Sequence, residues 1–254
     1  MERKYGIILG ILIIFILSIS VYYDSSANLN DNNPLYQVST LNSLSEGNYD
    51  EKISSGNLKY YGDTGMGTFT GLDGEMIELN GNIYQIKSDG NVYLVNNSAG
   101  IPYATVTFFK ADKVIITNKS MNYTELQQYL NSTLPSKNLV YSFKVIGKFD
   151  SVKARSPPKQ DKPYQNLTEA LKNQSIFNFN DINGTMVGFW FPRSASSINL
   201  NDYHFHFINE DRNSGGHVLD CKLENAIIEI DYISNVYIMY PQSNEFTKFN
   251  LAAS

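Results

Sequence analysis

Short apolar runs separated by glycine-containing turn pairs constrain the fold of this chain more than any other feature. Within residues 61–95, "YGDTGMGTFTGLDGEMIELNGNIYQIKSDGNVYLV", the pairs Asp73-Gly74, Asn80-Gly81 and Asp89-Gly90 each separate two such runs. These pairs favour the tight turns that join antiparallel strands. Further runs follow at 105–117, 138–155, 184–192 and 203–241, and aromatic residues, which favour strands, make up 13% of the chain. The sequence therefore predicts a β-rich protein dominated by antiparallel strands.

Three short segments have the pattern of helices. Residues 39–47 are expected to form a helix with Ser39 as its N-cap and Gly47 as its terminator, residues 122–135 form one that Pro135 ends, and residues 166–174 form a third. Residues 156–166, "SPPKQDKPYQN", hold three of the eight prolines and resemble a linker. We therefore expect an α+β fold of two lobes, with a mixed sheet and a barrel-like sheet, spanning residues 28–160 and 161–254.

The N-terminal 27 residues differ in character from the rest. Arg3 and Lys4 precede an apolar run from Tyr5 to Tyr23, and small residues at 25–27 could allow cleavage after Ala27. This pattern is typical of a secretory signal, but the run is also nearly long enough to span a bilayer. Both alternatives, a cleaved signal peptide and a membrane anchor, place the remaining chain outside the cytoplasm.

Charge and cysteine content exclude some functions. The chain carries 20 Lys and Arg against 25 Asp and Glu and contains no basic run, so we do not expect it to bind nucleic acid. The lone cysteine, Cys221, excludes an internal disulfide and cysteine-based zinc clusters, and is expected to be a small buried hydrophobe. No glycine-rich loop stands between a strand and a helix, so no nucleotide cofactor is expected.

All three histidines of the chain lie within residues 203–221, "YHFHFINEDRNSGGHVLDC". Side chains alternate between the two faces of a strand, so His204 and His206 point the same way, while Tyr203, Phe205 and Phe207 form an apolar face on the other side. Residues 209–216 form a turn, which brings His217 back beside the first two. Three converging imidazoles suit a catalytic zinc ion, which keeps a further position open for water or substrate.

The histidine segment is also compatible with two different roles. Paired histidines occur on exposed strands without a metal. The spacing His204-x-His206-x3-Glu210 matches the start of a cupin motif, but a cupin usually adds a histidine from a later motif, and none follows His217.

The same segment resembles the metal-binding segment of the acetolactate decarboxylases. The resemblance extends through "YQVSTLNSLSEGNYD" (36–50), "YGDTGMGTFTGLDGEMIELNG" (61–81), "LPSKNLVYSFKVIGKF" (134–149) and "KPYQNLTEALKNQSIFNFNDINGTMVGFW" (162–190), in the order of the family, over about residues 36–250. It implies zinc-dependent decarboxylation of 2-acetolactate, a small-molecule substrate, to acetoin. It also implies a homodimer and a metal held by His204, His206 and His217.

The resemblance also implies two catalytic residues, Glu75 in "LDGE" and Arg155 at the end of the 138–155 run. From the residues alone, Glu75 shares a strand face with Ile77 and Leu79, and apolar surroundings raise the pKa of a carboxyl group. Without the resemblance, however, Glu75 would be taken as an ordinary turn-adjacent glutamate and Arg155 as a linker charge.

One feature of the family has no counterpart in the sequence. Its members usually continue into a C-terminal tail with a glutamate that reaches the metal site, whereas this sequence ends at residue 254, and Glu245 lies too early to match. This motivates an alternative, a secreted metal- or ligand-binding module of the same fold that has lost activity; a cupin-like metal oxygenase is a further one. Because Glu75, Arg155 and the three histidines occur together, we favour the enzyme.

Overall fold

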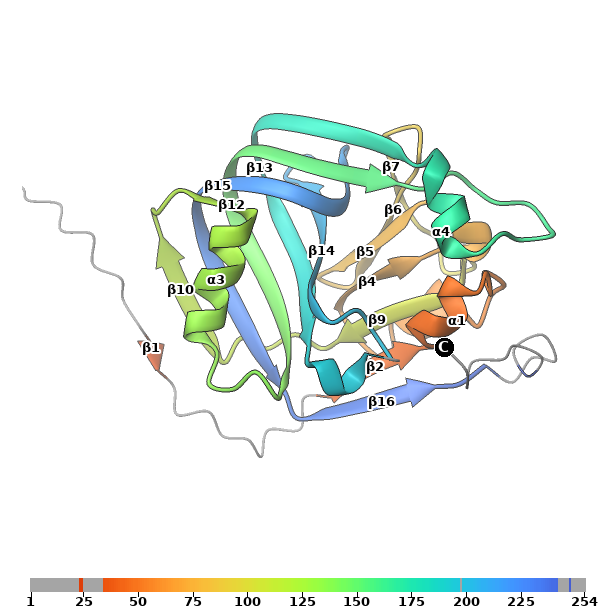
Figure 1. The fold of residues 1–254 in the computed structure, drawn as a ribbon, viewed down its shortest axis with the longest axis horizontal. Coiled ribbons are helices and arrows are strands. Elements are labelled where there is room, and N and C mark those ends of the chain that lie inside the picture. Colours follow the sequence, from red (N-terminus) through yellow and green to blue (C-terminus); the bar gives the residue numbers. More distant parts are fainter. Residues whose placement is uncertain (1–22, 25–33, 197, 242–246, 248–254) are drawn as a thin grey trace, which may run out of the picture.

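The structure is a computed structural model that describes residues 23–24, 34–196, 198–241 and 247 (Figure 1). The expected signal peptide or membrane anchor lies outside the described residues, apart from residues 23–24, and so does Glu245. Among the described residues, no helix combines the length and the apolar character needed to cross a membrane.

A seven-stranded sheet, all of whose described pairings are antiparallel, forms one half of the described structure. Four of its strands close a ring, because β12 pairs with β13 and β15, and β14 also pairs with both of these strands. This ring confirms the expected barrel-like sheet. The strands are β1 (Tyr23–Asp24), β10 (Lys113–Thr117), β11 (Met121–Asn122), β12 (Val140–Ser156), β13 (Ser175–Phe191), β14 (Asp202–Asn209) and β15 (Gly215–Ile233).

The second seven-stranded sheet is mixed, also as expected, because β16 pairs with β2 in parallel and the other pairs are antiparallel. The turn pairs lie where the sequence predicts them, between β4 and β5, between β5 and β6 and between β6 and β7. In sheet order the strands are β16 (Asn235–Met239), β2 (Pro34–Val38), β9 (Tyr103–Thr107), β4 (Thr64–Thr68), β5 (Glu75–Leu79), β6 (Asn82–Ile86) and β7 (Val92–Leu94). A separate pair joins β3 (Ile53–Ser54) to β8 (Gly100–Ile101).

The strands are not divided between the two sheets at the proline-rich segment. β10 and β12 precede residue 160 but pair with β15, and β16 follows it but pairs with β2. The boundary expected between lobes 28–160 and 161–254 therefore does not coincide with the boundary between the sheets. Pairings between strands far apart in the chain decide sheet membership, and local turn signals carry no information about them.

The predicted helices are present with shifted ends. α1 spans Leu41–Ser45, and its N-cap is Thr40, whose side chain accepts a hydrogen bond from the Ser43 amide, whereas the sequence predicts Ser39 in this role. α3 spans Tyr123–Thr133 with a capping box formed by Asn122 and Glu125. α4 spans Leu167–Ala170 and continues into the 3-10 turn η2, Leu171–Asn173. The remaining helical turns are α2 (Ser55–Leu58), η1 (Thr70–Leu72) and η3 (Arg193–Ala195).

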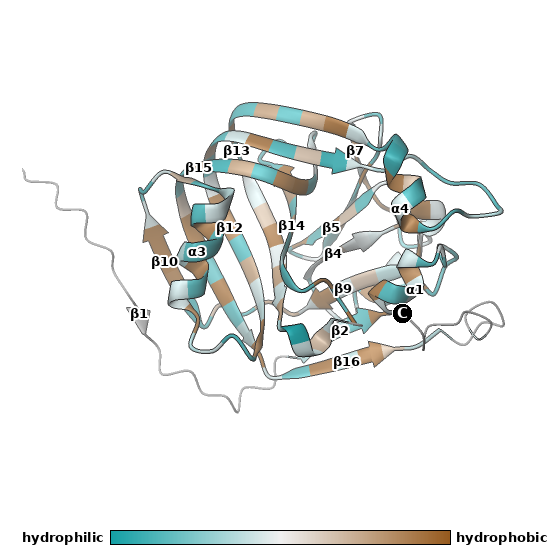
Figure 2. Cartoon of the chain, viewed as in Figure 1, coloured by the Kyte–Doolittle hydropathy of each residue, from teal (hydrophilic) through white to brown (hydrophobic). Residues whose placement is uncertain are grey.

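Apolar side chains lie on both faces of the antiparallel sheet. Hydrophobic (brown) and hydrophilic (teal) residues alternate along β12, β13 and β15 in Figure 2. On one face, Phe205 and Phe207 are fully buried in a cluster that includes Leu126 and Leu130 of α3. On the other face, Ile208 packs against Ile77 and other residues of the second sheet. The predicted aromatic face of β14 is therefore core, and its histidine face points into the layer between the sheets.

A β-bulge at Leu219 changes the face of β15 on which the following side chains lie. Ala154 of β12 pairs with Val218 and Lys153 pairs with Asp220, so Leu219 is an extra residue in β15. Because of this insertion, Val218 and Cys221 both reach the apolar cluster beneath α3. Regular alternation would instead put Cys221 on the face of His217. Cys221 is a free, buried thiol, as the sequence predicts.

Glu78 lies on the face of β5 opposite to Ile77 and carries a carboxyl group that the sequence does not single out. Glu78 is fully buried, and neither of its carboxyl oxygens has a hydrogen-bond partner among the described residues. Burial raises its pKa to about 8, and nearby Lys59 offsets this only in part. The folded protein thus favours the neutral acid at this position.

Replacement of Glu78 tests this assignment through the pH dependence of stability. Because the pKa of Glu78 is raised in the folded state, Glu78 contributes stability that is fully present below the unfolded pKa near 4.5. That stability is lost as the pH rises through the folded pKa of about 8. Glu78→Gln should remove this loss, so that the variant exceeds the parent by on the order of 5 kcal/mol in unfolding free energy at pH 9, but not at pH 4. Urea unfolding at both pH values measures this, and Glu210→Gln, at an exposed carboxylate, should follow the parent.

Candidate metal centre

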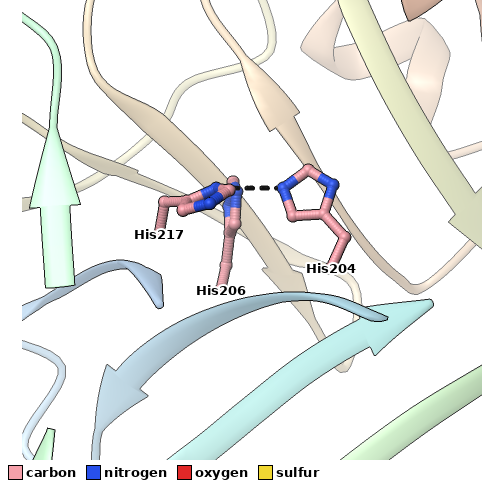
Figure 3. Close-up of side chains that lie close together, drawn as sticks. All are labelled: His204, His206 and His217. Carbon is pink, nitrogen blue, oxygen red and sulfur yellow. Dashed lines mark hydrogen bonds between the residues drawn. The ribbon is translucent and has the colours of Figure 1, made fainter. Parts of the chain in front are cut away.

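The hairpin of β14 and β15 brings the three histidines together as predicted. His206 and His217 are directly paired across the two strands, and His204 precedes His206 by two residues on the same face. Figure 3 shows the three imidazoles turned toward one another above the two strands. Each residue offers a ligand atom, and these atoms lie within 4.8 Å of one another.

The ring nitrogens of two of these histidines are in direct contact. His204 Nε2 and His217 Nδ1 are 3.0 Å apart, so one nitrogen donates to the other (dashed in Figure 3). The ring centroid of His206 lies 5.1 Å from that of His204 and 5.3 Å from that of His217. The imidazoles are tilted relative to one another instead of stacked, which lets their nitrogens converge on one point.

A backbone carbonyl of the second sheet orients His206. Its Nδ1 donates a hydrogen bond of 2.7 Å to the carbonyl oxygen of Met76 in β5. This bond fixes the tautomer, because a nitrogen that faces a carbonyl carries the proton, and it leaves the lone pair on Nε2. His206 Nε2 is buried and has no hydrogen-bond partner within the described part of the chain. Metal-binding histidines commonly use this outer contact to a carbonyl.

Burial keeps the three imidazoles neutral. It lowers the pKa of His206 to about 4, against the raising effect of the bond to Met76, and lowers the pKa values of His204 and His217 well below the ordinary value. Arg155 lowers all three pKa values further, and neighbouring histidines also lower those of His204 and His217, since each added positive charge is repelled. Neutral imidazole is the form that binds metal ions.

Glu75 lies beside this cluster, on the β5 face that also carries Ile77 and Leu79, as the sequence predicts. Its Oε2 is 3.4 Å from His206 Nε2. Desolvation raises the pKa of Glu75 to about 7, and the positive charge of Arg155 opposes part of this rise. Because His206 is neutral near pH 7, the contact between Glu75 and His206 is not an ion pair. A carboxyl group with a pKa near neutrality can both give and accept a proton.

Arg155 also faces the histidines. It is paired with His217 across β12 and β15, and its Nη1 donates a hydrogen bond of 3.0 Å to Oε1 of Gln174. Its Nε is buried, and no described residue accepts a hydrogen bond from it. One side of the guanidinium is thus tethered while a donor remains for another acceptor.

All five predicted site residues line one cavity of about 240 Å³ between the sheets. This volume lies below the usual range of drug-sized pockets, so the cavity suits a small molecule. Its charged and metal-ligating side is formed by Glu75, Arg155 and the three histidines, and leucines form much of its remaining wall.

These residues fit a zinc ion or a similar divalent metal. Two imidazole nitrogens, His204 Nδ1 and His206 Nε2, are buried without a described hydrogen-bond partner, and such groups are costly unless a ligand satisfies them. Three neutral nitrogen donors with an adjacent carboxyl group are typical of catalytic zinc sites.

Comparisons with known proteins assign the chain to a family. A family model described as "Alpha-acetolactate decarboxylase" matches residues 35–253. The chain belongs to the alpha-acetolactate decarboxylase family. The enzyme of that name from Methanosarcina mazei is 47% identical over 223 residues, which cover 88% of this chain and 77% of the relative. The Bacillus subtilis enzyme is 41% identical over 217 residues, 85% of each chain.

A solved structure of the alpha-acetolactate decarboxylase from Bacillus subtilis superposes with a TM-score of 0.84 at 41% identity. The superposition covers 86% of this chain and 93% of that one. The sequence resemblance, the α+β fold and the assignment to decarboxylase enzymes are therefore confirmed.

Two groups that position the site have no signal in the sequence. Met76 contributes a backbone carbonyl, which any residue type could supply, and Gln174 is a single amide after a short helix. Only the packing of β5 against β14, and the pairing of β12 with β13, bring them to His206 and Arg155.

Two glycines allow β15 to close against its neighbours. A Cβ on Gly215 would lie 2.2 Å from the Phe207 carbonyl oxygen, and one on Gly216 would lie 2.6 Å from that of Arg155. Gly216 also has a φ of 144°, which L-residues rarely adopt. Because His217 follows directly, this close approach sets the position of a candidate ligand.

Gly216→Ala should therefore loosen the metal centre as well as the fold. We expect a loss of about 1 kcal/mol or more in unfolding free energy, together with weaker zinc binding in a competition titration. Gly81→Ala is the matched control, because its φ is also positive, at 74°, but its Cβ would meet nothing within 4 Å. Equal zinc affinity in the two variants would contradict the proposed role of the close approach.

Proposed function

We propose that this chain decarboxylates 2-acetolactate to acetoin with a zinc ion bound by His204, His206 and His217. The observation that carries the proposal is the convergence of these histidines, Glu75 and Arg155 on one cavity, in a chain of the alpha-acetolactate decarboxylase family. A zinc ion bound there would act as a Lewis acid and stabilise the negative charge that develops on the keto oxygen as carbon dioxide leaves.

Arg155 is proposed to orient the substrate. The substrate is a carboxylate with a neighbouring hydroxyl and keto group, and a guanidinium donor forms strong, directional hydrogen bonds with such oxygens. The tether to Gln174 restricts the side chain, so less conformational freedom is lost when the substrate binds. The free Nε–H is the donor that we assign to a substrate oxygen.

Glu75 is proposed to deliver the proton that completes the reaction. Loss of carbon dioxide breaks the bond from C2 to the carboxyl carbon, and the electron pair moves toward the keto group to give an enediolate. Acetoin forms when C2 of this enediolate gains a proton. Glu75 suits this step because its raised pKa keeps a substantial fraction of the group protonated near neutral pH.

Metal removal tests the first part of the proposal. Chelation should abolish acetoin formation, and added Zn²⁺ should restore it. His204→Ala should weaken zinc binding by more than about 100-fold, since changes in the groups around metal ligands alone cost up to this much. Zinc content by mass spectrometry and acetoin by a colorimetric assay are the measurements. Cys221→Ala, on the opposite side of β15, should keep its zinc; activity in a metal-free sample would overturn the metal's role.

Glu75→Gln tests the proton step separately. The variant should keep its zinc, because the histidines are unchanged, while kcat falls by on the order of 100- to 10,000-fold. If zinc content falls in parallel with kcat, Glu75 is a metal ligand and not the proton donor. Comparison with His204→Ala separates the two cases, since that variant should lose both.

We further propose that the domain acts outside the cytoplasm and as a homodimer. The support for the location is the basic residues Arg3 and Lys4 before the apolar run 5–23, and the support for the dimer is the family resemblance. Mass spectrometry of the mature N-terminus distinguishes a cleaved signal from a retained anchor, and light scattering measures the oligomeric state.

A further inference from the structure

Two of the leucines on the apolar side of the cavity are not part of the hydrophobic core. Six leucines line the cavity: Leu41, Leu44, Leu72, Leu167, Leu171 and Leu200. The first four belong to, or pack against, one apolar cluster around Tyr49 and Ala170. Leu171 and Leu200 belong to none of the apolar clusters of the described residues, although both line the cavity. A partly exposed leucine beside a cavity is free to contact a ligand.

A buried polar network holds Leu200 in place. Asn199 is 1% exposed, and its Nδ2 donates hydrogen bonds of 2.9 Å to Gln37 Oε1 and 3.0 Å to Thr105 Oγ1. Its Oδ1 accepts a hydrogen bond of 2.7 Å from the Leu200 amide. The loop before β14 is therefore bonded to two strands of the mixed sheet. Leu200 is 38% exposed, yet its backbone is fixed at the cavity.

Leu171 is fixed relative to Arg155. It begins η2, which follows α4 and its N-cap Asn166, and Gln174 ends the same turn. Gln174 is the residue that accepts the hydrogen bond from Arg155 Nη1. Leu171 and Gln174, which tethers the Arg155 guanidinium, are therefore three residues apart on one short element.

We propose that Leu171 and Leu200 contact the alkyl group on C2 of the substrate and set the largest alkyl group that the enzyme accepts. This inference rests on the proposed function. The carboxylate and the alkyl group are both attached to C2, and Leu171 lies on the same short turn as Gln174, which tethers Arg155. The charged residues cannot solvate an alkyl group, whereas the leucines can.

The test compares 2-acetolactate with its homologue that carries an ethyl group on C2. A single methylene in an apolar pocket commonly changes kcat/KM by tenfold or more. Leu171→Ala and Leu200→Ala should each raise the ethyl-to-methyl ratio of kcat/KM by about tenfold, with unchanged zinc content. Leu139→Ala is the matched control, because Leu139 is 36% exposed and lies outside the cavity lining. Unchanged ratios, or an equal loss for both substrates, would overturn the inference.

A binding measurement separates this inference from the proposed function. Reduction of the keto group gives dihydroxy acids that cannot lose carbon dioxide, and calorimetry gives their Kd values for the methyl and ethyl forms. If the parent does not turn over 2-acetolactate, the proposed function fails. The ratio of these Kd values in the parent and the two leucine variants then still decides the inference: a shift toward the ethyl form supports the contact, and a constant ratio overturns it.

Discussion

The closure of the strand ring, in which β15 pairs with both β12 and β14, is the constraint on which the site depends. The pairing of His206 with His217, and of His217 with Arg155, puts two candidate ligands and a cation in one row of the closed ring. The row forms only because Gly215 and Gly216 let three backbones approach closely. The bulge at Leu219 then turns Cys221 into the apolar cluster that also contains Val218, without moving His217 from the cavity. Local backbone geometry therefore positions the residues of the candidate metal centre.

One physical cause, desolvation between the sheets, gives the ionisable groups their opposite shifts. Burial disfavours charge, so the pKa values of the imidazoles fall and that of Glu75 rises. The positive charge of Arg155 lowers the pKa of Glu75, against the effect of burial. It also lowers the pKa values of the histidines, in addition to the effect of burial. The result is a set of neutral nitrogen donors beside a carboxyl group that titrates near neutral pH. Glu78 has a similarly raised pKa on the other face of β5 but faces no ligand group, so burial alone does not make a site.

The sequence predicts the local features of this protein and misses those that depend on distant pairings. Turn pairs, strand alternation and the histidine hairpin are encoded within a few residues, and Glu75 could be placed on the face of Ile77 because a strand alternates. The sequence predicts Ser39 as the cap of α1 in place of Thr40, since adjacent Ser and Thr are equivalent caps in sequence. The association of β12 with β15 and the parallel pairing of β16 with β2 had no local signal. For the same reason the Met76 carbonyl and Gln174 could not have been assigned.

The cavity is built from two kinds of element, and this division has a consequence for how the site could change. Strands of both sheets carry the residues assigned to chemistry, and a change in their register would turn every side chain to the other face. Short helical turns and the loop before β14 carry Leu171 and Leu200, which belong to no described apolar cluster. A substitution at either leucine therefore alters the shape of the cavity at little cost in packing, and leaves the hydrogen bonds of His206 and Arg155 intact. The residues proposed to contact the substrate's alkyl group can thus vary independently of those proposed to act on its carboxylate.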